Sequence, residues 1–219
     1  MLVRRRSFLS AAVLFSLTGC KQTATVREAD KPDMIGSHAA GAETFKPLVE
    51  TAVGQLLSRH AAPVVGPSGE PLAAAPKRIC FVAVENQSSE EIGDFKDQIY
   101  QIIDMHIVQS GVFQPVNKRF VDAGLMQTRL RPDSLMVAQN MRTFTAVMEQ
   151  QGQPFDFLLY ATLNSGTTQD NAAKQKDYLL TLELVNIHDG SYDKQAATIS
   201  KGYYPSVVSK WMSQVGLRR

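Results

Sequence analysis

The chain has 219 residues, of which 44% are hydrophobic and 20% charged, a composition typical of a globular protein with one sizeable core. Its 23 basic and 21 acidic residues nearly cancel, so the basic excess that favours nucleic-acid binding is absent. The four histidines are scattered, without partners at the spacing of a metal site, so neither a metal nor another cofactor is expected.

The first twenty residues have the parts of a bacterial export signal. Arg4 to Arg6 form a positively charged start, and Phe8 to Leu17 form an apolar stretch too short to span a bilayer as a stable helix. Leu17-Thr18-Gly19-Cys20 follows and resembles the lipobox of bacterial lipoproteins. This resemblance implies that Cys20 receives diacylglycerol, that the chain is cut between Gly19 and Cys20, and that the new N-terminus is acylated. The alternative is an ordinary signal peptide, or an uncleaved helix, with a chance cysteine.

Cleavage would remove residues 1–19 with their three arginines, leaving 20 basic and 21 acidic residues and a formal net charge of −1. Several acyl chains on one cysteine anchor a protein firmly, whereas a single chain holds weakly. Lys21 follows the cysteine, and the sorting rule of such lipoproteins then implies the periplasmic face of the outer membrane. Residues 20–41 are polar, which predicts a lipidated flexible tether of at most about 70 Å.

A single periplasmic domain is expected over residues 42–219. Apolar residues recur at helical spacing from Phe45 to Leu57 and predict a helix. Ala61 to Ala75 is rich in proline and glycine and is expected to be a loop. Arg78 to Val84 is an apolar run that predicts a buried strand. It contains Cys80, which has no disulfide partner if Cys20 is lipidated and is expected to be an inert buried thiol.

The middle of the chain alternates helices and a strand. After the polar loop from Asn86 to Glu91, apolar residues from Ile92 to Ile107 predict an amphipathic helix. Val112 to Val116 predicts a second strand, and Pro115 favours an edge or a strand end. Two further helices are expected, at Phe120–Gln127 and Pro132–Met148.

The C-terminal part predicts three strands and a last helix. The strands are Phe155–Leu163, Tyr178–Val185 and Tyr192–Ser200, the last two joined by the Asp189-Gly190 turn. Pro205 to Gly216 predicts a helix with Val207, Val208, Trp211 and Val215 on one face. The fold class is therefore α/β: a sandwich with a mixed, mostly antiparallel sheet, which starts as βαβ, ends in a β-meander and is flanked by helices.

The chain lacks the sequence motifs of enzymes. It has no zinc-protease motif, nucleophile elbow, phosphate loop or dinucleotide glycine pattern, so no catalytic residue is assigned and no small-molecule substrate is expected. Glu90 and Glu91 follow the first strand, where active sites of open α/β sheets lie. Their expected role is electrostatic, at the positive N-terminus of the next helix. A hydrolase that uses either carboxylate is the alternative, and it predicts activity that Glu→Gln abolishes.

The strand from Ile79 to Val84 and three later segments together resemble the CsgG/LpoB superfamily of periplasmic lipoproteins. The superfamily patterns are S-G-x-F-x-x-V, A-D-Y-x-L-x-G and Y-x-L-x-L-x-L-V-D-x-x-T-G, in this order. The matching segments are Ser110–Val116, Phe155–Ala161 and Tyr178–Gly190. The chain departs from the patterns at Asn186, where Asp is usual, and at Ala161-Thr162, where Gly is usual.

Two branches of this superfamily matter. The LpoB branch comprises outer-membrane lipoproteins that activate a bifunctional penicillin-binding peptidoglycan synthase, and the CsgG branch forms secretion channels. Channels need additional membrane strands of about ten alternating residues. The segments between the expected elements are rich in proline, glycine or charge, which favours the activator branch.

The resemblance leads to a regulatory hypothesis. We expect an outer-membrane lipoprotein that binds and regulates a periplasmic protein, foremost by activating a peptidoglycan synthase. Asn86, Gln87 and Ser88 are the candidate partner-binding residues, because they form a polar loop at a strand end. The alternative is an accessory subunit of a secretion, conjugation or polysaccharide-export assembly.

Overall fold

The computed structural model describes residues 42–61, 64–65, 71–72, 76–169 and 174–203. The lipobox, the tether and the expected helix at Pro205–Gly216 lie outside these residues. The helices are α1 (Ala42–His60), α2 (Phe95–Ser110), α3 (Lys118–Thr128) and α4 (Ala138–Gln150), with the 3-10 helix η1 (Pro132–Met136). The strands are β1 (Val64–Val65), β2 (Pro71–Leu72), β3 (Lys77–Asn86), β4 (Phe113–Pro115), β5 (Phe157–Gln169), β6 (Lys174–Asn186) and β7 (Tyr192–Tyr203).

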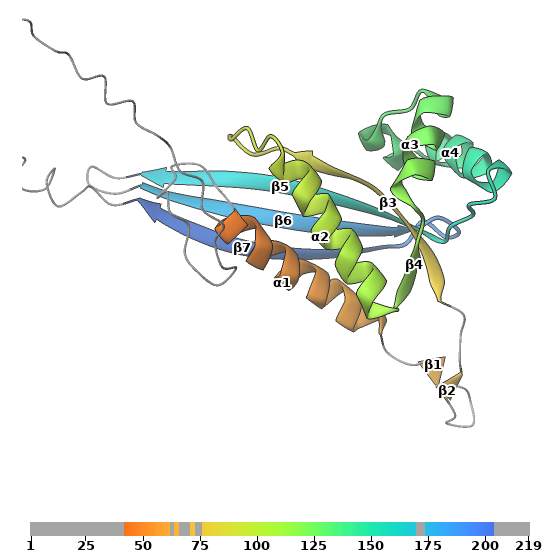
Figure 1. The fold of residues 1–219 in the computed structure, drawn as a ribbon, viewed down its shortest axis with the longest axis horizontal. Coiled ribbons are helices and arrows are strands. Elements are labelled where there is room, and N and C mark those ends of the chain that lie inside the picture. The colour runs from red at the N-terminus through yellow and green to blue at the C-terminus, as the bar shows by residue number, and fades with distance from the viewer. Residues whose placement is uncertain (1–41, 62–63, 66–70, 73–75, 170–173, 204–219) are drawn as a thin grey trace, which may run out of the picture. The chain divides into compact units, whose positions relative to one another are not determined.

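The main sheet has five strands in the order β4-β3-β5-β6-β7 (Figure 1). β3 pairs in parallel with β4 on one side and with β5 on the other, whereas β5, β6 and β7 form an antiparallel meander. The predicted α/β fold with a βαβ start and a C-terminal meander is confirmed. Pro115 lies in the edge strand β4, as expected for a residue that cannot donate a backbone hydrogen bond.

Helices cover both faces of the sheet, although unequally. α1 and α2 pack on one face and form the larger core with the even-numbered apolar residues of β6, Tyr178 to Leu184. α3, η1 and α4 form a smaller core on the opposite face, near the end where β5 begins (Figure 1). That core contains Cys80, Val82, Val121, Leu135, Phe144, Met148, Phe155 and Leu158. No helix among the described residues is long and apolar enough to cross a membrane.

Three expectations about local structure need correction. α2 begins at Phe95, so Glu90 and Glu91 lie in the preceding loop and not in the first turn of the helix. The helix expected at Pro132–Met148 is divided, because Val137 is extended between η1 and α4. Within Ala61–Ala75, which was expected to be a loop, the structure describes the short antiparallel pair β1 and β2.

A bulge in β3 determines to which face of the sheet the following side chains of the strand point. Phe81 pairs with Leu159 and Ala83 with Tyr160, so Val82 is one residue in excess over the partner strand. Val82 and Ala83 both contact the smaller core, after which Val84 faces the larger one. The end of β3 therefore presents its side chains in the opposite phase to its start, beside the loop that leads to α2.

Candidate functional site

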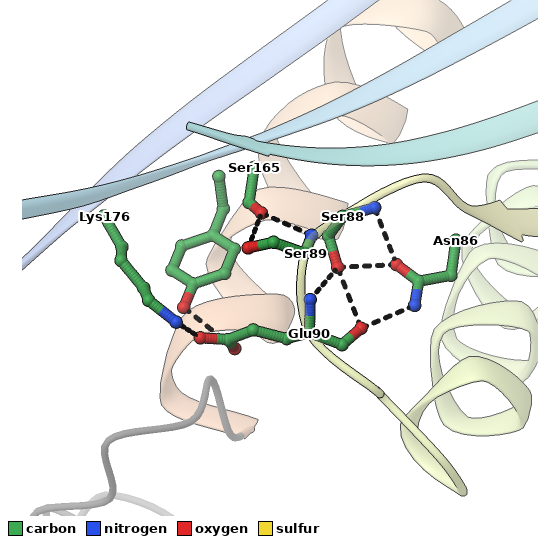
Figure 2. A network of polar contacts seen from close by, with 7 residues as sticks. Asn86, Ser88, Ser89, Glu90, Ser165 and Lys176 are labelled. Atoms are coloured by element: carbon green, nitrogen blue, oxygen red, sulfur yellow. Dashed lines mark hydrogen bonds and ion pairs between the residues drawn. The ribbon is translucent and has the colours of Figure 1, made fainter. Parts of the chain in front are cut away.

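The loop between β3 and α2, residues 87–94, is shaped by its own polar side chains (Figure 2). The Asn86 Oδ1 atom accepts hydrogen bonds from the Ser88 backbone N–H at 3.0 Å and from its Oγ at 2.6 Å. The Asn86 Nδ2 atom donates to the Glu90 carbonyl at 2.7 Å. Asn commonly closes a turn in this way, so the local sequence itself favours the loop conformation.

Contacts with distant strands hold the same loop against the sheet. The Gln87 backbone N–H donates to the Leu163 carbonyl at 2.8 Å, and the Ser89 backbone N–H donates to Ser165 Oγ at 3.0 Å, both on β5. The Glu90 carboxylate forms an ion pair with Lys176 and accepts a hydrogen bond from the Tyr178 hydroxyl at 3.0 Å, both on β6 (Figure 2). These contacts hold the first half of the loop, from Gln87 to Glu90, against β5 and β6.

The ion pair between Glu90 and Lys176 is nearly removed from solvent. The side chains are 10% and 12% exposed, respectively. Sequence reasoning missed this pair, whose members are 86 residues apart. A signal was present, because Lys176 lies in phase with Tyr178 and Leu180 on the apolar face of β6, where an isolated lysine requires a partner.

The structure brings the predicted contact residues Asn86, Gln87 and Ser88 together but gives them different roles. Asn86 and Ser88 are half-buried and direct their polar atoms into the loop. Gln87 is exposed, and its amide donates to Glu85 Oε2 at 3.1 Å. Ser89 and Glu91 are exposed beside it. The side chains open to a partner are thus those of Gln87, Ser89 and Glu91, and Asn86 and Ser88 fix their positions.

A cleft opens next to this loop, between α2 and the α3–η1 segment. Two adjoining hollows of about 260 and 140 Å³ share the residues Ala83, Val84, Lys96 and Pro132. The cleft exists because β4 pairs only with the first three residues of β3. Farther along that edge, the Phe81 carbonyl accepts its hydrogen bond from the Tyr100 hydroxyl, at 3.0 Å, and not from a strand.

Two tyrosines line the cleft, Tyr100 in one hollow and Tyr160 in the other. Burial, followed by the negative charge of Asp104, raises the pKa of Tyr100. Burial and a 2.7 Å hydrogen bond to Glu85 raise the pKa of Tyr160, so both phenols remain neutral hydrogen-bond donors. Burial likewise raises the pKa of the Cys80 thiol. The described residues contain no group of three or more His, Cys, Asp or Glu side chains that could hold a metal ion.

Comparison with known proteins identifies the family. A family model described as "Peptidoglycan-synthase activator LpoB" matches residues 44–192, from α1 to the first residue of β7. The chain belongs to the LpoB family. The match spans most of the described domain and includes the loop and the cleft, so the expected superfamily resemblance is confirmed in its LpoB branch. The LpoB family is one of regulators, which favours the activator hypothesis over an assembly subunit or a hydrolase.

Two LpoB C-terminal domains and one further lipoprotein are among the solved structures that are similar to the chain at low identity. The LpoB C-terminal domain from Salmonella enterica is 13% identical, with a TM-score of 0.44, over 74% of this chain and 98% of that one. The domain from Escherichia coli is 16% identical, with a TM-score of 0.43, over 68% and 97%. Lipoprotein GNA1162 from Neisseria meningitidis is 16% identical, with a TM-score of 0.43, over 65% and 100%. No curated protein sequence matches the chain.

Proposed function

We propose that the chain is an outer-membrane lipoprotein, anchored through Cys20, whose periplasmic domain binds and activates a bifunctional penicillin-binding peptidoglycan synthase. The observation that carries this proposal is the match of residues 44–192 to the family of peptidoglycan-synthase activators. The lipobox-like Leu17-Thr18-Gly19-Cys20 supports the anchor, and Lys21 supports the outer membrane.

The mechanism is allosteric. An activator shifts the conformational equilibrium of its partner only if it binds the active state of the partner more tightly than the inactive state. The β3–α2 loop suits this task, because its internal and long-range hydrogen bonds order it before binding and so reduce the entropy lost in the complex. Gln87, Ser89 and Glu91 supply the contacts.

The tether limits where the partner can be. Residues 20–41 reach at most about 70 Å from the membrane when fully extended. The synthase must therefore bring its contact surface to within the length of the tether plus the extent of the domain from the outer membrane. Within this reach, anchoring raises the effective concentration of the domain at the synthase.

Titration against a purified bifunctional synthase from the same cell tests the function and the contact residues. We use the mature chain, residues 20–219, with Cys20→Ser to omit the lipid. The wild-type loop is expected to bind, and Gln87→Arg to weaken binding, whereas Gln55→Arg on the exposed side of α1 leaves it unchanged. An absence of binding contradicts the function, and unchanged binding by Gln87→Arg contradicts only the contact residues.

The anchor is tested separately in cells. Cys20→Ala should abolish labelling by a palmitate analogue and release the protein from the outer membrane, because only the thiol can form the thioether to diacylglycerol. The domain itself should bind its partner as before. Failure of the wild type to take up label, or sedimentation of the variant with the outer membrane, contradicts the lipoprotein assignment.

A further inference from the structure

The cleft beside the β3–α2 loop lies where a further strand of the main sheet would run. β4 pairs with Lys77 to Ile79, and after Pro115 the chain turns away into α3. Within the described part of the chain, no strand pairs with this side of β3 beyond Ile79. Residues of α2 line the cleft on one side, and residues of α3 and η1 line it on the other. The cleft is therefore a slot between helices with a strand edge at its bottom.

The backbone of Val84 faces this slot. Successive residues of a strand direct their N–H and C=O groups to opposite edges. The Gln87 N–H donates to the Leu163 carbonyl on β5, so the backbone groups of Glu85 also face β5 and those of Val84 face the slot. Neither group of Val84 has a hydrogen-bond partner there among the described residues. The Val84 side chain is buried in the larger core, so its backbone is what the slot offers to a partner.

The Tyr100 hydroxyl marks one end of the slot. It donates to the Phe81 carbonyl at 3.0 Å, which shows that Phe81 also faces the slot and already has its partner. Three residues separate Phe81 from Val84, in place of two, because of the bulge at Val82. A strand that entered the slot would therefore pair with β3 from Val84 onward.

The charges of the slot indicate which side chain such a strand should carry. Lys96 lines both hollows and has no ion-pair partner within the described residues. The other two basic groups of the slot are paired, Lys118 with Asp122 at 2.6 Å and Arg131 with Asp133 at 3.3 Å. Lys96 is thus the cation that a bound molecule can neutralise.

The remaining acidic groups of the slot do not take this place. Glu85 accepts hydrogen bonds from the Tyr160 hydroxyl at 2.7 Å and from the Gln87 amide at 3.1 Å. Asp97 lines only the hollow toward α3. In the hollow of about 140 Å³ next to η1, a carboxylate of a bound peptide would therefore complement Lys96.

We infer that the slot takes an extended segment of the synthase as an added strand, paired with β3 at Val84 and carrying an acidic side chain that meets Lys96. Backbone hydrogen bonds then supply affinity, and the walls of the slot supply specificity. The identity of the partner rests on the proposed function. The slot adjoins the loop that presents Gln87, so one partner can contact both.

Amide hydrogen exchange, read residue by residue by NMR, tests the slot first in the free mature chain with Cys20→Ser. The Glu85 N–H belongs to the ladder with β5, whereas the Val84 N–H has no described acceptor. Val84 should therefore exchange about tenfold faster than Glu85. Equal exchange of the two amides would mean that the edge is already occupied, which overturns the inference without any synthase.

The purified bifunctional synthase from the same cell is then added, and exchange in the complex is read on the chain after quenching. Val84 exchange should slow by about tenfold or more. Lys96→Glu should raise the dissociation constant roughly five- to tenfold, and Lys96→Arg should leave it near the wild-type value. Lys46→Glu is the matched control, because it makes the same change of charge at an exposed position on α1 and should not affect binding. Circular dichroism confirms that the variants remain folded.

Each failure has its own meaning. Binding of the synthase that leaves Val84 exchange unchanged overturns the added strand and leaves the proposed function intact. An equal loss of affinity in Lys46→Glu and Lys96→Glu overturns the role of Lys96. An absence of binding overturns the proposed function and, with it, this inference. Slowing of Val84 exchange by inorganic phosphate alone assigns the slot to a small anion instead.

Discussion

Breaking the ion pair between Lys176 and Glu90 should destabilise the domain and release the β3–α2 loop. Removing one partner of a buried pair costs about 3–5 kcal/mol, because a charge remains in a poorly solvated place. The two side chains are only 12% and 10% exposed, and the Tyr178 hydroxyl still donates to Glu90 in the variant. We therefore expect the lower end of the range for Lys176→Met, about 3 kcal/mol. For a domain of this size the melting temperature should fall by roughly 6–12 °C.

Urea unfolding of the mature chain with Cys20→Ser measures this cost. Lys46→Met is the control, because the Lys46–Glu50 pair on α1 is 58% and 48% exposed and should contribute less than about 1 kcal/mol. The double variant Lys176→Met/Glu90→Leu leaves neither charge in place, so its cost should be below the sum of the two single costs by about 2 kcal/mol. A cost for Lys176→Met no larger than that for Lys46→Met, or additive single costs, would refute the reasoning.

Three further predictions concern the rest of the domain. Gly54→Ala should stabilise α1 by about 0.5–1 kcal/mol. Gly124→Ala should instead lower the melting temperature, because its Cβ would lie 2.8 Å from Met148 Sδ and 3.0 Å from Phe144 Cε2. Equal effects of the two substitutions on the melting temperature would contradict this packing. Burial opposes the charge on Asp156, but hydrogen bonds from the Arg78 backbone and His188 outweigh it and lower the pKa of Asp156. The charged Asp156 carboxylate therefore stabilises the fold above its usual pKa, and this stabilisation is lost as the pH falls through the lowered pKa. Asp156→Asn should then cost stability at neutral pH and progressively less in acid. A cost that does not change with pH would contradict this account. The Cys80 thiol is fully buried and its pKa is raised, so a maleimide should label the chain with Cys20→Ser only after unfolding, and rapid labelling of the folded chain would disprove that burial.

The spacing of apolar residues correctly predicted the helices and strands that bury only one of their faces. β6 alternates Tyr178, Leu180 and Leu182 with residues on the other face, and such alternation is specific for a half-buried strand. The start of α2 was predicted too early because Ile92 is apolar and has the spacing of the helix's buried face. In the structure Ile92 is buried, but it lies in the loop before α2. The pairing of β3 with β5 was not predictable, because the sequence of a strand that is buried on both faces does not indicate which strands lie beside it.

The site was predictable only in outline. A polar loop after a buried strand was evident, and Asn86 was a turn residue by its chemistry. Which of Asn86, Gln87 and Ser88 would face outward depends on contacts with Leu163 and Ser165, far away in sequence. Such contacts follow from the register of the whole sheet, which local patterns do not determine.

The rate of glycan polymerisation by the bifunctional synthase of the same cell tests the central claim most directly. The mature chain with Cys20→Ser should raise that rate in proportion to the fraction of synthase bound, and the boiled chain should not. Gln55→Arg should activate fully, and Gln87→Arg should require a higher concentration for the same rate. Binding without any change in the polymerisation rate, or no binding at all, would contradict the assignment of this chain as a peptidoglycan-synthase activator.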